Sequence, residues 1–135
     1  MNKQIFIAII SLVFFTACDQ SARTKKNTEP LEAGREFIDA SLKGDYDYAK
    51  QYLLPDSTNV IYFDRYKEFD KNMSEAEKKG YKNANIIINS AENISDSEMI
   101  INYSNTFKNK PSKIRVVKKN NEWLVDFKYT FSGNM

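Results

Sequence analysis

The chain has 135 residues, 20 basic and 18 acidic side chains, a net charge of +2, one cysteine and no histidine. A chain so close to neutral generates no strong electrostatic field for nucleic acid or another polyanion. The missing histidine excludes serine-histidine and cysteine-histidine nucleophile systems and the usual zinc ligand sets. Only four glycines are present, too few for a phosphate-cradling loop. We therefore expect no metal, no cofactor and no nucleic-acid partner.

The first seventeen residues have the layout of a secretory signal. Lys3 precedes an apolar run from Ile5 to Phe15, and polar residues follow Cys18. The apolar run has about eleven residues, whereas a membrane-spanning helix needs about twenty. This run is therefore expected to direct export and then to be removed.

The residues Phe15-Thr16-Ala17-Cys18 resemble the lipobox of bacterial lipoproteins, with Phe15 where a branched aliphatic residue is more usual. The resemblance implies cleavage between Ala17 and Cys18, attachment of a diacylglycerol to Cys18, and acylation (palmitate) of the new amino group. An ordinary secretory signal with an incidental cysteine is the alternative. Cys18 has no possible disulfide partner in the chain, which favours lipidation. Two or three acyl chains hold a protein far more firmly than one.

These features divide the chain into three parts: a signal peptide (1–17), a lipidated cysteine with a flexible polar tether (18–29), and one folded domain (30–135). The expected location is the bacterial cell envelope, with membrane lipid as the partner of acylated Cys18. A periplasm-facing inner or outer membrane and the cell surface all remain open.

Residues from Pro30 to Gly44 carry apolar side chains at three- and four-residue spacing, which predicts an amphipathic helix. Proline suits its first turn, and Gly44 suits its C-terminal end. Asp45 can cap a second short helix that Pro55 ends. That helix places four apolar side chains on one side: Tyr48, Ala49, Tyr52 and Leu53.

The segment from Asn59 to Asn72 also has roughly helical spacing, with capping residues at 56–58. Its first five residues, 59–63, are β-branched and aromatic, so a short strand is the alternative. Ser74 and Glu77 form a capping box for a fourth small helix that is expected to run to Lys79 and stop at Gly80.

After Gly80 the apolar period changes from helical to two. Four strands are predicted, namely Ala84 to Glu92, Glu98 to Phe107, Lys113 to Lys119 and Trp123 to Phe131. The pair Asn120-Asn121 can adopt the positive φ of a tight hairpin turn. In the last strand Trp123, Val125, Phe127, Tyr129 and Phe131 alternate with mostly polar residues. The order predicts an α+β domain with N-terminal helices packed on one face of a four-stranded antiparallel meander.

A Gly44-Asp45-Tyr46 joint between two helices, followed by a meander ending in Trp123-Leu124-Val125-Asp126, resembles small bacterial lipoproteins of unknown function with a nuclear-transport-factor-2-like, or cystatin-like, domain. The resemblance implies a curved sheet wrapped around a long helix, forming a cone whose open end can hold a ligand. Some members are isomerases, dehydratases or cyclases, and many only bind. Because fold does not choose between these functions, and no aspartate here matches a catalytic motif, no catalytic residue is carried over.

Two aspartates, Asp64 and Asp126, lie among apolar or aromatic residues and could have a role in a site. Asp64, between Tyr62 and Tyr66, could act as a general base beside phenols inside the cone, although a solvated acid on an aromatic-rich helix is the favoured interpretation. Asp126 lies in alternation with Leu124 and Lys128 and is expected to be exposed on the outer sheet face.

A basic patch follows the third predicted strand and its flanks: Lys108, Lys110, Lys113, Arg115, Lys118 and Lys119. It could contact phospholipid headgroups or an anionic envelope polymer. Solvated lysines that discourage edge-to-edge association of sheets are the favoured alternative.

Seven aromatic residues are candidates for lining a pocket, because tyrosine and tryptophan combine apolar walls with hydrogen-bonding tips: Phe37, Tyr48, Tyr52, Tyr62, Tyr66, Trp123 and Phe127. The first hypothesis is a non-catalytic envelope module that binds a small ligand, a peptide or an envelope protein. The alternatives are a histidine-free isomerase or hydratase-like enzyme that uses Asp64, and a structural accessory of envelope assembly.

Overall fold

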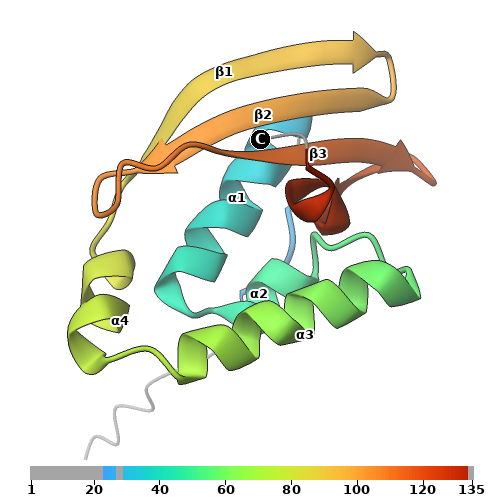
Figure 1. Ribbon diagram of the computed structural model, residues 1–135. Helices are drawn as coiled ribbons and strands as arrows, with labels where there is room; N and C mark the ends of the chain where they lie inside the picture. The colour runs from blue at the N-terminus through green and yellow to red at the C-terminus, as the bar shows by residue number, and fades with distance from the viewer. Residues whose placement is uncertain (1–22, 27–28, 134–135) are drawn as a thin grey trace, which may run out of the picture.

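The computed structural model describes residues 23–26 and 29–133. The cleavage and lipidation predicted at Ala17 and Cys18 therefore lie outside the described residues. Within these residues, four α-helices precede a four-stranded antiparallel sheet and a short 3₁₀ helix, which confirms the predicted α+β class. Figure 1 shows the curved sheet above and the helices gathered beneath it.

The first two helices form as their caps predict. α1 (Pro30–Lys43) begins at a proline and ends at Gly44, whose φ of 76° is the left-handed conformation typical of a helix end. α2 (Tyr46–Lys50) begins after Asp45, whose side chain accepts a hydrogen bond from the backbone N–H of Tyr48 at 3.3 Å. The two helices therefore meet at a tight joint.

α3 (Ser57–Lys71) settles the choice between helix and strand in favour of the helix. Asp56 caps it by accepting from the backbone N–H of Asn59 at 2.9 Å. Asn59 and Phe63, one turn apart, are both buried against the rest of the domain. Burial of this one stripe outweighs the β propensity of residues 59–63.

α4 (Glu75–Lys82) has the predicted Ser74 cap, because the Ser74 hydroxyl accepts from the backbone N–H of Glu77 at 3.3 Å. The helix continues through Gly80, contrary to the expected stop. Gly80 faces the ring of Phe107, which a Cβ at position 80 would overlap. The absence of a side chain at Gly80 therefore allows α4 to pack closely against Phe107, which follows β2.

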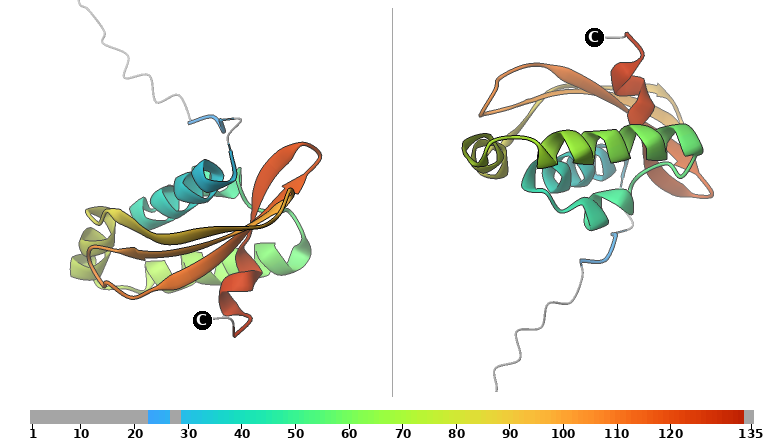
Figure 2. Two further views of the ribbon diagram at one scale, coloured as in Figure 1. Left: turned by 90° about the horizontal axis from the view of Figure 1, so that it is seen from above. Right: turned by 60° about the horizontal axis from the view of Figure 1, so that its bottom comes forward.

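The sheet has the order β1-β2-β3-β4, with β1 (Ile86–Ser95), β2 (Glu98–Asn105), β3 (Ser112–Lys119) and β4 (Glu122–Asp126). Its central pairs are apolar: Ile101 opposite Ile114, and Val116 opposite Val125. The turn between β3 and β4 uses Asn120 and Asn121 at φ 51° and 63°, as predicted. Figure 2 shows how strongly the sheet twists, with the β3–β4 hairpin diverging from the direction of β1.

The last predicted strand is wrong beyond Asp126. Residues Phe127–Phe131 form the 3₁₀ helix η1. The backbone N–H of Lys128 donates to the side-chain oxygen of Asn59 at 2.7 Å, and the Thr130 hydroxyl donates to the carbonyl of Lys113 at 2.8 Å. These contacts with α3 and β3 replace the ladder that the alternating aromatic residues suggested.

Residues 23–26 belong to the segment predicted to be a flexible tether, and they lie against α1 and α2. The backbone N–H of Lys26, for example, donates to the hydroxyl of Tyr52 at 3.2 Å. The part of the tether that the structure describes is thus in contact with the domain.

Candidate functional site

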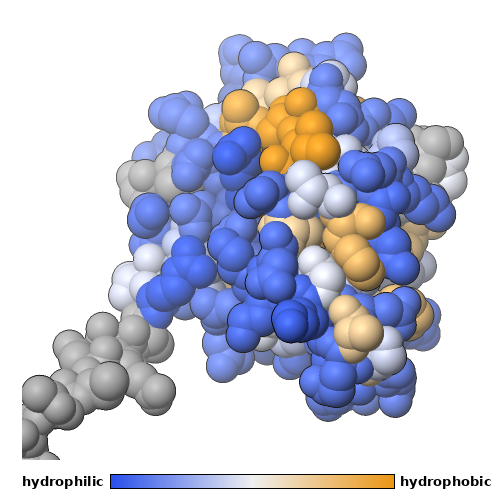
Figure 3. Space-filling view, turned by 90° about the vertical axis from the view of Figure 1, so that its left-hand side faces the viewer, coloured by the Kyte–Doolittle hydropathy of each residue, from blue (hydrophilic) through white to orange (hydrophobic). Residues whose placement is uncertain are grey.

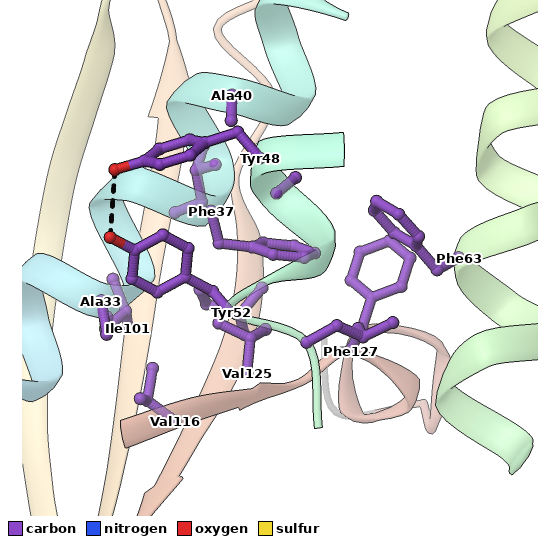
Figure 4. Packing of buried hydrophobic residues seen from close by; sticks show 14 of the residues in the cluster. Ala33, Phe37, Ala40, Tyr48, Tyr52, Phe63, Ile101, Val116, Val125 and Phe127 are labelled. Carbon is purple, nitrogen blue, oxygen red and sulfur yellow. Dashed lines mark hydrogen bonds between the residues drawn. The ribbon is translucent and has the colours of Figure 1, made fainter. Parts of the chain in front are cut away.

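The interior between helices and sheet is filled by side chains. Phe37 on α1 lies 5.7 Å from Phe63 and 5.4 Å from Phe127, measured between ring centroids. Tyr48 and Tyr52 share a buried hydrogen bond of 3.1 Å between their hydroxyls. Figure 4 shows these rings packed between α1, α2 and the sheet. Four of the seven candidate pocket residues therefore belong to the hydrophobic core: Phe37, Tyr48, Tyr52 and Phe127.

The other three candidates pack around this core and are only partly buried. Tyr66 meets the ring of Phe127 edge-on at 5.8 Å, and Tyr62 stacks on exposed Phe131 at 5.1 Å. Trp123 lies at the start of β4, where the ammonium group of Lys118 is 5.7 Å from its ring. The fold thus distributes the seven aromatic residues over the core and two separate surface regions instead of around one cavity.

Asp64 is exposed on α3, in agreement with the favoured interpretation of a solvated acid. The enzyme hypothesis required a buried Asp64. The structure places this residue outside the core, so it gives that hypothesis no general base at position 64.

Asp126 is the residue for which the expectation of exposure is wrong: it is only 2% exposed. It belongs to a polar cluster of five residues, Asp56, Asn59, Arg115, Asp126 and Lys128. Its carboxylate accepts from the Arg115 guanidinium at 2.5 Å, the Lys128 ammonium at 2.8 Å and the Asn59 amide at 2.9 Å. Alternation does place Asp126 on the face of its register partner Arg115, but α3 and η1 cover it there.

The same contacts decide the ionisation of the two carboxyl groups. Burial alone would disfavour the charged form of Asp126, but hydrogen bonds from Lys128, Arg115 and Asn59 outweigh it and keep its pKa below the ordinary value. The hydrogen bond from the Asn59 backbone, aided by Lys128, lowers the pKa of Asp56 to about 2. Both groups are therefore charged at neutral pH and join the start of α3 to the end of β4.

The predicted basic patch is not continuous. The cluster around Asp126 includes Arg115, and the pleat of the sheet places other cations of the patch on the opposite face. Arg115 is neutralised by Asp126 and, at 3.4 Å, by Glu98. Lys118 contacts Trp123 on the opposite face of β3 from Arg115. Lys108 pairs with Glu77 of α4 at 3.6 Å. The six cations therefore do not act as one surface, and the ion-pair cluster around Asp126 is a structural joint.

A surface hollow of about 590 Å³ opens where the start of α1 faces the tip of the β1–β2 hairpin and the start of β4. Leu31, Met99 and Trp123 give it apolar walls, and Glu29 and Asp96 contribute carboxylates. The full lining is Glu29, Pro30, Leu31, Asn93, Ser95, Asp96, Met99 and Trp123. Its size is within the range of small-ligand sites. Apolar walls with carboxylates suit a ligand that has an apolar body and a cationic group.

The aromatic composition identified only Trp123 of this hollow. The sequence analysis places the other lining residues in the tether, the first helical turn, the hairpin turn and, for Met99, the second predicted strand. Only the curvature of the sheet brings these segments together, so no local signal in the sequence marks them as one site.

A second exposed feature is the free edge of the sheet at β1. Ile87 is 39% and Ile94 48% exposed in this strand. Figure 3, which faces the left-hand side of Figure 1, shows an apolar patch near the top, where the sheet lies, within a mostly hydrophilic surface. β1 carries two register irregularities, at 88–90 and 93–95, which interrupt the regularity of this edge.

Among residues 23–26 and 29–133, no helix is long and apolar enough to cross a membrane. Nor do these residues contain a group of three or more histidine, cysteine, aspartate or glutamate side chains arranged to hold a metal ion. No family model, curated protein or solved structure matches this chain.

Proposed function

We propose that this protein is a lipid-anchored lipoprotein of the bacterial cell envelope whose folded domain binds a ligand without chemically changing it. The anchor is supported by the short apolar leader and the lone Cys18 that follows it. The non-catalytic role is supported by the absence of histidine from the chain and by the exposure of Asp64.

The hollow between α1 and the β1–β2 hairpin is the observation that carries the binding proposal. Glu29 and Asp96 line this hollow together with Trp123, Leu31 and Met99. An amine held over an indole ring and near carboxylates gains both cation-π and ionic attraction. The ligand class is therefore an amphipathic cation.

A pair of matched probes tests this proposal: 4-phenylbutylamine and 4-phenylbutyrate, which share an apolar body and carry opposite charges. Trp123 is the only tryptophan in the chain, so its emission reports directly on the hollow. We expect a saturable change with the amine and a weaker one with the acid. Asp96→Asn should weaken binding of the amine, and exposed Asp64→Asn is the matched control. No saturable change with either probe would contradict the proposal.

The anchor is tested separately. Replacing Cys18 by serine removes the thiol that lipidation requires, so the Cys18→Ser variant should lose its membrane association or remain unprocessed. Mass spectrometry of the native amino terminus should find a diacylated or triacylated cysteine at position 18. An unmodified cysteine in mature protein would contradict the anchor.

A structural accessory of envelope assembly is the second candidate, favoured by the filled core and by exposed Ile87 and Ile94 on the free β1 edge. A strand from a partner could extend the sheet there. Photocrosslinking from position 87 in intact cells should then trap one defined partner, with position 64 on α3 as the control. Equal labelling from both positions would contradict this role.

A further inference from the structure

Residues 23–26 form the segment that we call the clasp, and its main chain is held by the side chains of Gln51 and Tyr52. The backbone N–H of Lys26 donates to the Tyr52 hydroxyl at 3.2 Å. The Gln51 amide accepts from the backbone N–H of Lys25 at 2.7 Å and donates to the backbone carbonyl of Arg23 at 2.9 Å. These two bonds copy the way a neighbouring β-strand pairs with a main chain. Gln51 therefore binds the backbone of the clasp at one defined place.

The side chains of the clasp meet a part of the domain surface that has the opposite charge. Glu36, only 12% exposed in its side chain, lies 3.2 Å from Arg23 and 3.4 Å from Lys26. Arg23 also reaches Asp45 at 3.5 Å, and Lys25 reaches Glu122 of β4 at 3.4 Å. Three cations thus face three carboxylates that are distributed over α1, the start of α2 and β4.

Aromatic rings also contact the side chains of the clasp. The Arg23 guanidinium lies 3.9 Å from the ring centroid of Tyr48, and the Lys25 ammonium lies 5.5 Å from that of Tyr52. Both tyrosines are buried, and a hydrogen bond joins their hydroxyls, so packing and this bond fix the positions of the two rings. Backbone pairing, charge and cation-π contact all select the same short basic segment.

We infer that the clasp holds the folded domain close to the membrane, with the α1–α2 surface that it contacts facing the bilayer; this rests on the proposed lipidation of Cys18. Arg23 is the fifth residue after Cys18, and a fully extended chain of five residues spans at most about 18 Å. With the clasp released, the same limit applies to the twelve residues up to Pro30, which span up to about 43 Å. Docking thus more than halves the maximal reach of the anchor.

The clasp also fixes the orientation of the domain. Both views in Figure 2 show residues 23–26 and η1 on opposite sides of the molecule. A docked clasp therefore directs η1, with exposed Phe131, away from the membrane. Because exposed ion pairs are individually weak and are screened by salt, the clasp opens as ionic strength rises.

The experiment uses the mature lipidated protein in neutral phosphatidylcholine vesicles that contain a dansyl-labelled phospholipid. Energy transfer from Trp123 to the dansyl headgroups reports the height of the domain above the bilayer. Trypsin cleavage after Arg23, Lys25 and Lys26 reports opening of the clasp in the same sample. Gln51→Ala removes the two hydrogen bonds that Gln51 makes with the clasp backbone and leaves the one between Lys26 and Tyr52. Asn83→Ala, which truncates an exposed amide at the end of α4, is the matched control.

We expect Gln51→Ala to lower the energy transfer and to raise the cleavage rate roughly fivefold, because cleavage follows the population of the open clasp. Asn83→Ala should leave both unchanged. Equal transfer and equal cleavage in the wild type and Gln51→Ala would overturn the inference. Failure of the wild type to associate with vesicles, with cleavage still slow, would refute the membrane anchor and leave the clasp contact itself intact.

Discussion

Replacing Asp126 by asparagine tests whether the cluster of Asp56, Asn59, Arg115, Asp126 and Lys128 joins α3 to β4. The substitution keeps the size of the side chain and removes its charge. It removes the oxygen Oδ2 to which the Arg115 guanidinium donates two hydrogen bonds, at 3.0 and 2.5 Å, and it leaves the Lys128 ammonium, at 2.8 Å from Oδ1, with a neutral amide oxygen. It also directs an amide N–H group toward cations that have only donors to offer.

The expected loss follows from these contacts. A charge-assisted hydrogen bond contributes about 1.5–3 kcal/mol, and two are lost. Arg115 and Lys128 are 32% and 36% exposed in their side chains, so both regain part of their hydration. We therefore expect Asp126→Asn to lower the free energy of unfolding by about 2–3 kcal/mol, a large share of the stability of a domain of this size.

Urea unfolding at pH 7, followed by the emission of Trp123, measures this loss. Asp64→Asn is the matched control, because Asp64 is exposed on α3, and it should change stability by less than about 0.5 kcal/mol. The dependence on urea should be equal in all three proteins. A loss below about 0.5 kcal/mol for Asp126→Asn would show that the cluster does not stabilise the domain.

Three further predictions concern pH, packing and turn geometry. The pKa values of Asp56 and Asp126 are lower in the folded protein than in the unfolded chain, so the stability that these groups contribute is complete above about pH 4 and is lost as the pH falls toward 2. Acid titration of the wild type should show this loss, and the difference in stability between the wild type and Asp126→Asn should shrink over the same pH range. Gly34→Ala should destabilise the domain by about 1–3 kcal/mol in urea unfolding, since the added Cβ would overlap Ile101 and lie 3.3 Å from Ile114; an unchanged midpoint would contradict the close approach of α1 to the sheet. Asn121→Gly should stabilise the domain by about 0.5 kcal/mol and so raise its thermal midpoint slightly, because position 121 has a φ of 63°, which glycine adopts without strain. A lower midpoint would contradict the described β3–β4 turn.

The candidate site could be predicted only in part. Trp123 was recognised as a pocket-lining residue, but Glu29, Asn93 and Asp96 come from segments that are far apart in the chain and carry only tether or turn signals. The other six aromatic candidates combine apolar rings with helical or alternating spacing. That pattern is the same for a core residue and for a pocket wall, so the sequence could not separate the two.

The sequence by itself determined the elements whose signals are local. Caps at Asp45, Asp56 and Ser74, the glycine that ends α1, and the two asparagines between β3 and β4 each act through hydrogen bonds or backbone conformations within a few residues. These signals were enough to predict the order of helices and strands and the α+β class.

Only the tertiary structure decided where β4 ends, why Asp126 is buried and where residues 23–26 lie. Each outcome depends on partners 11 to 69 residues away along the chain, such as Arg115 for Asp126, Asn59 for Lys128 and Gln51 for Lys25. Alternation and charge describe what a side chain prefers. Whether the carboxylate of Asp126 lies beside cations, or the backbone of Lys25 lies beside an amide, depends on how the sheet curves over the helices. That curvature is a property of the whole fold.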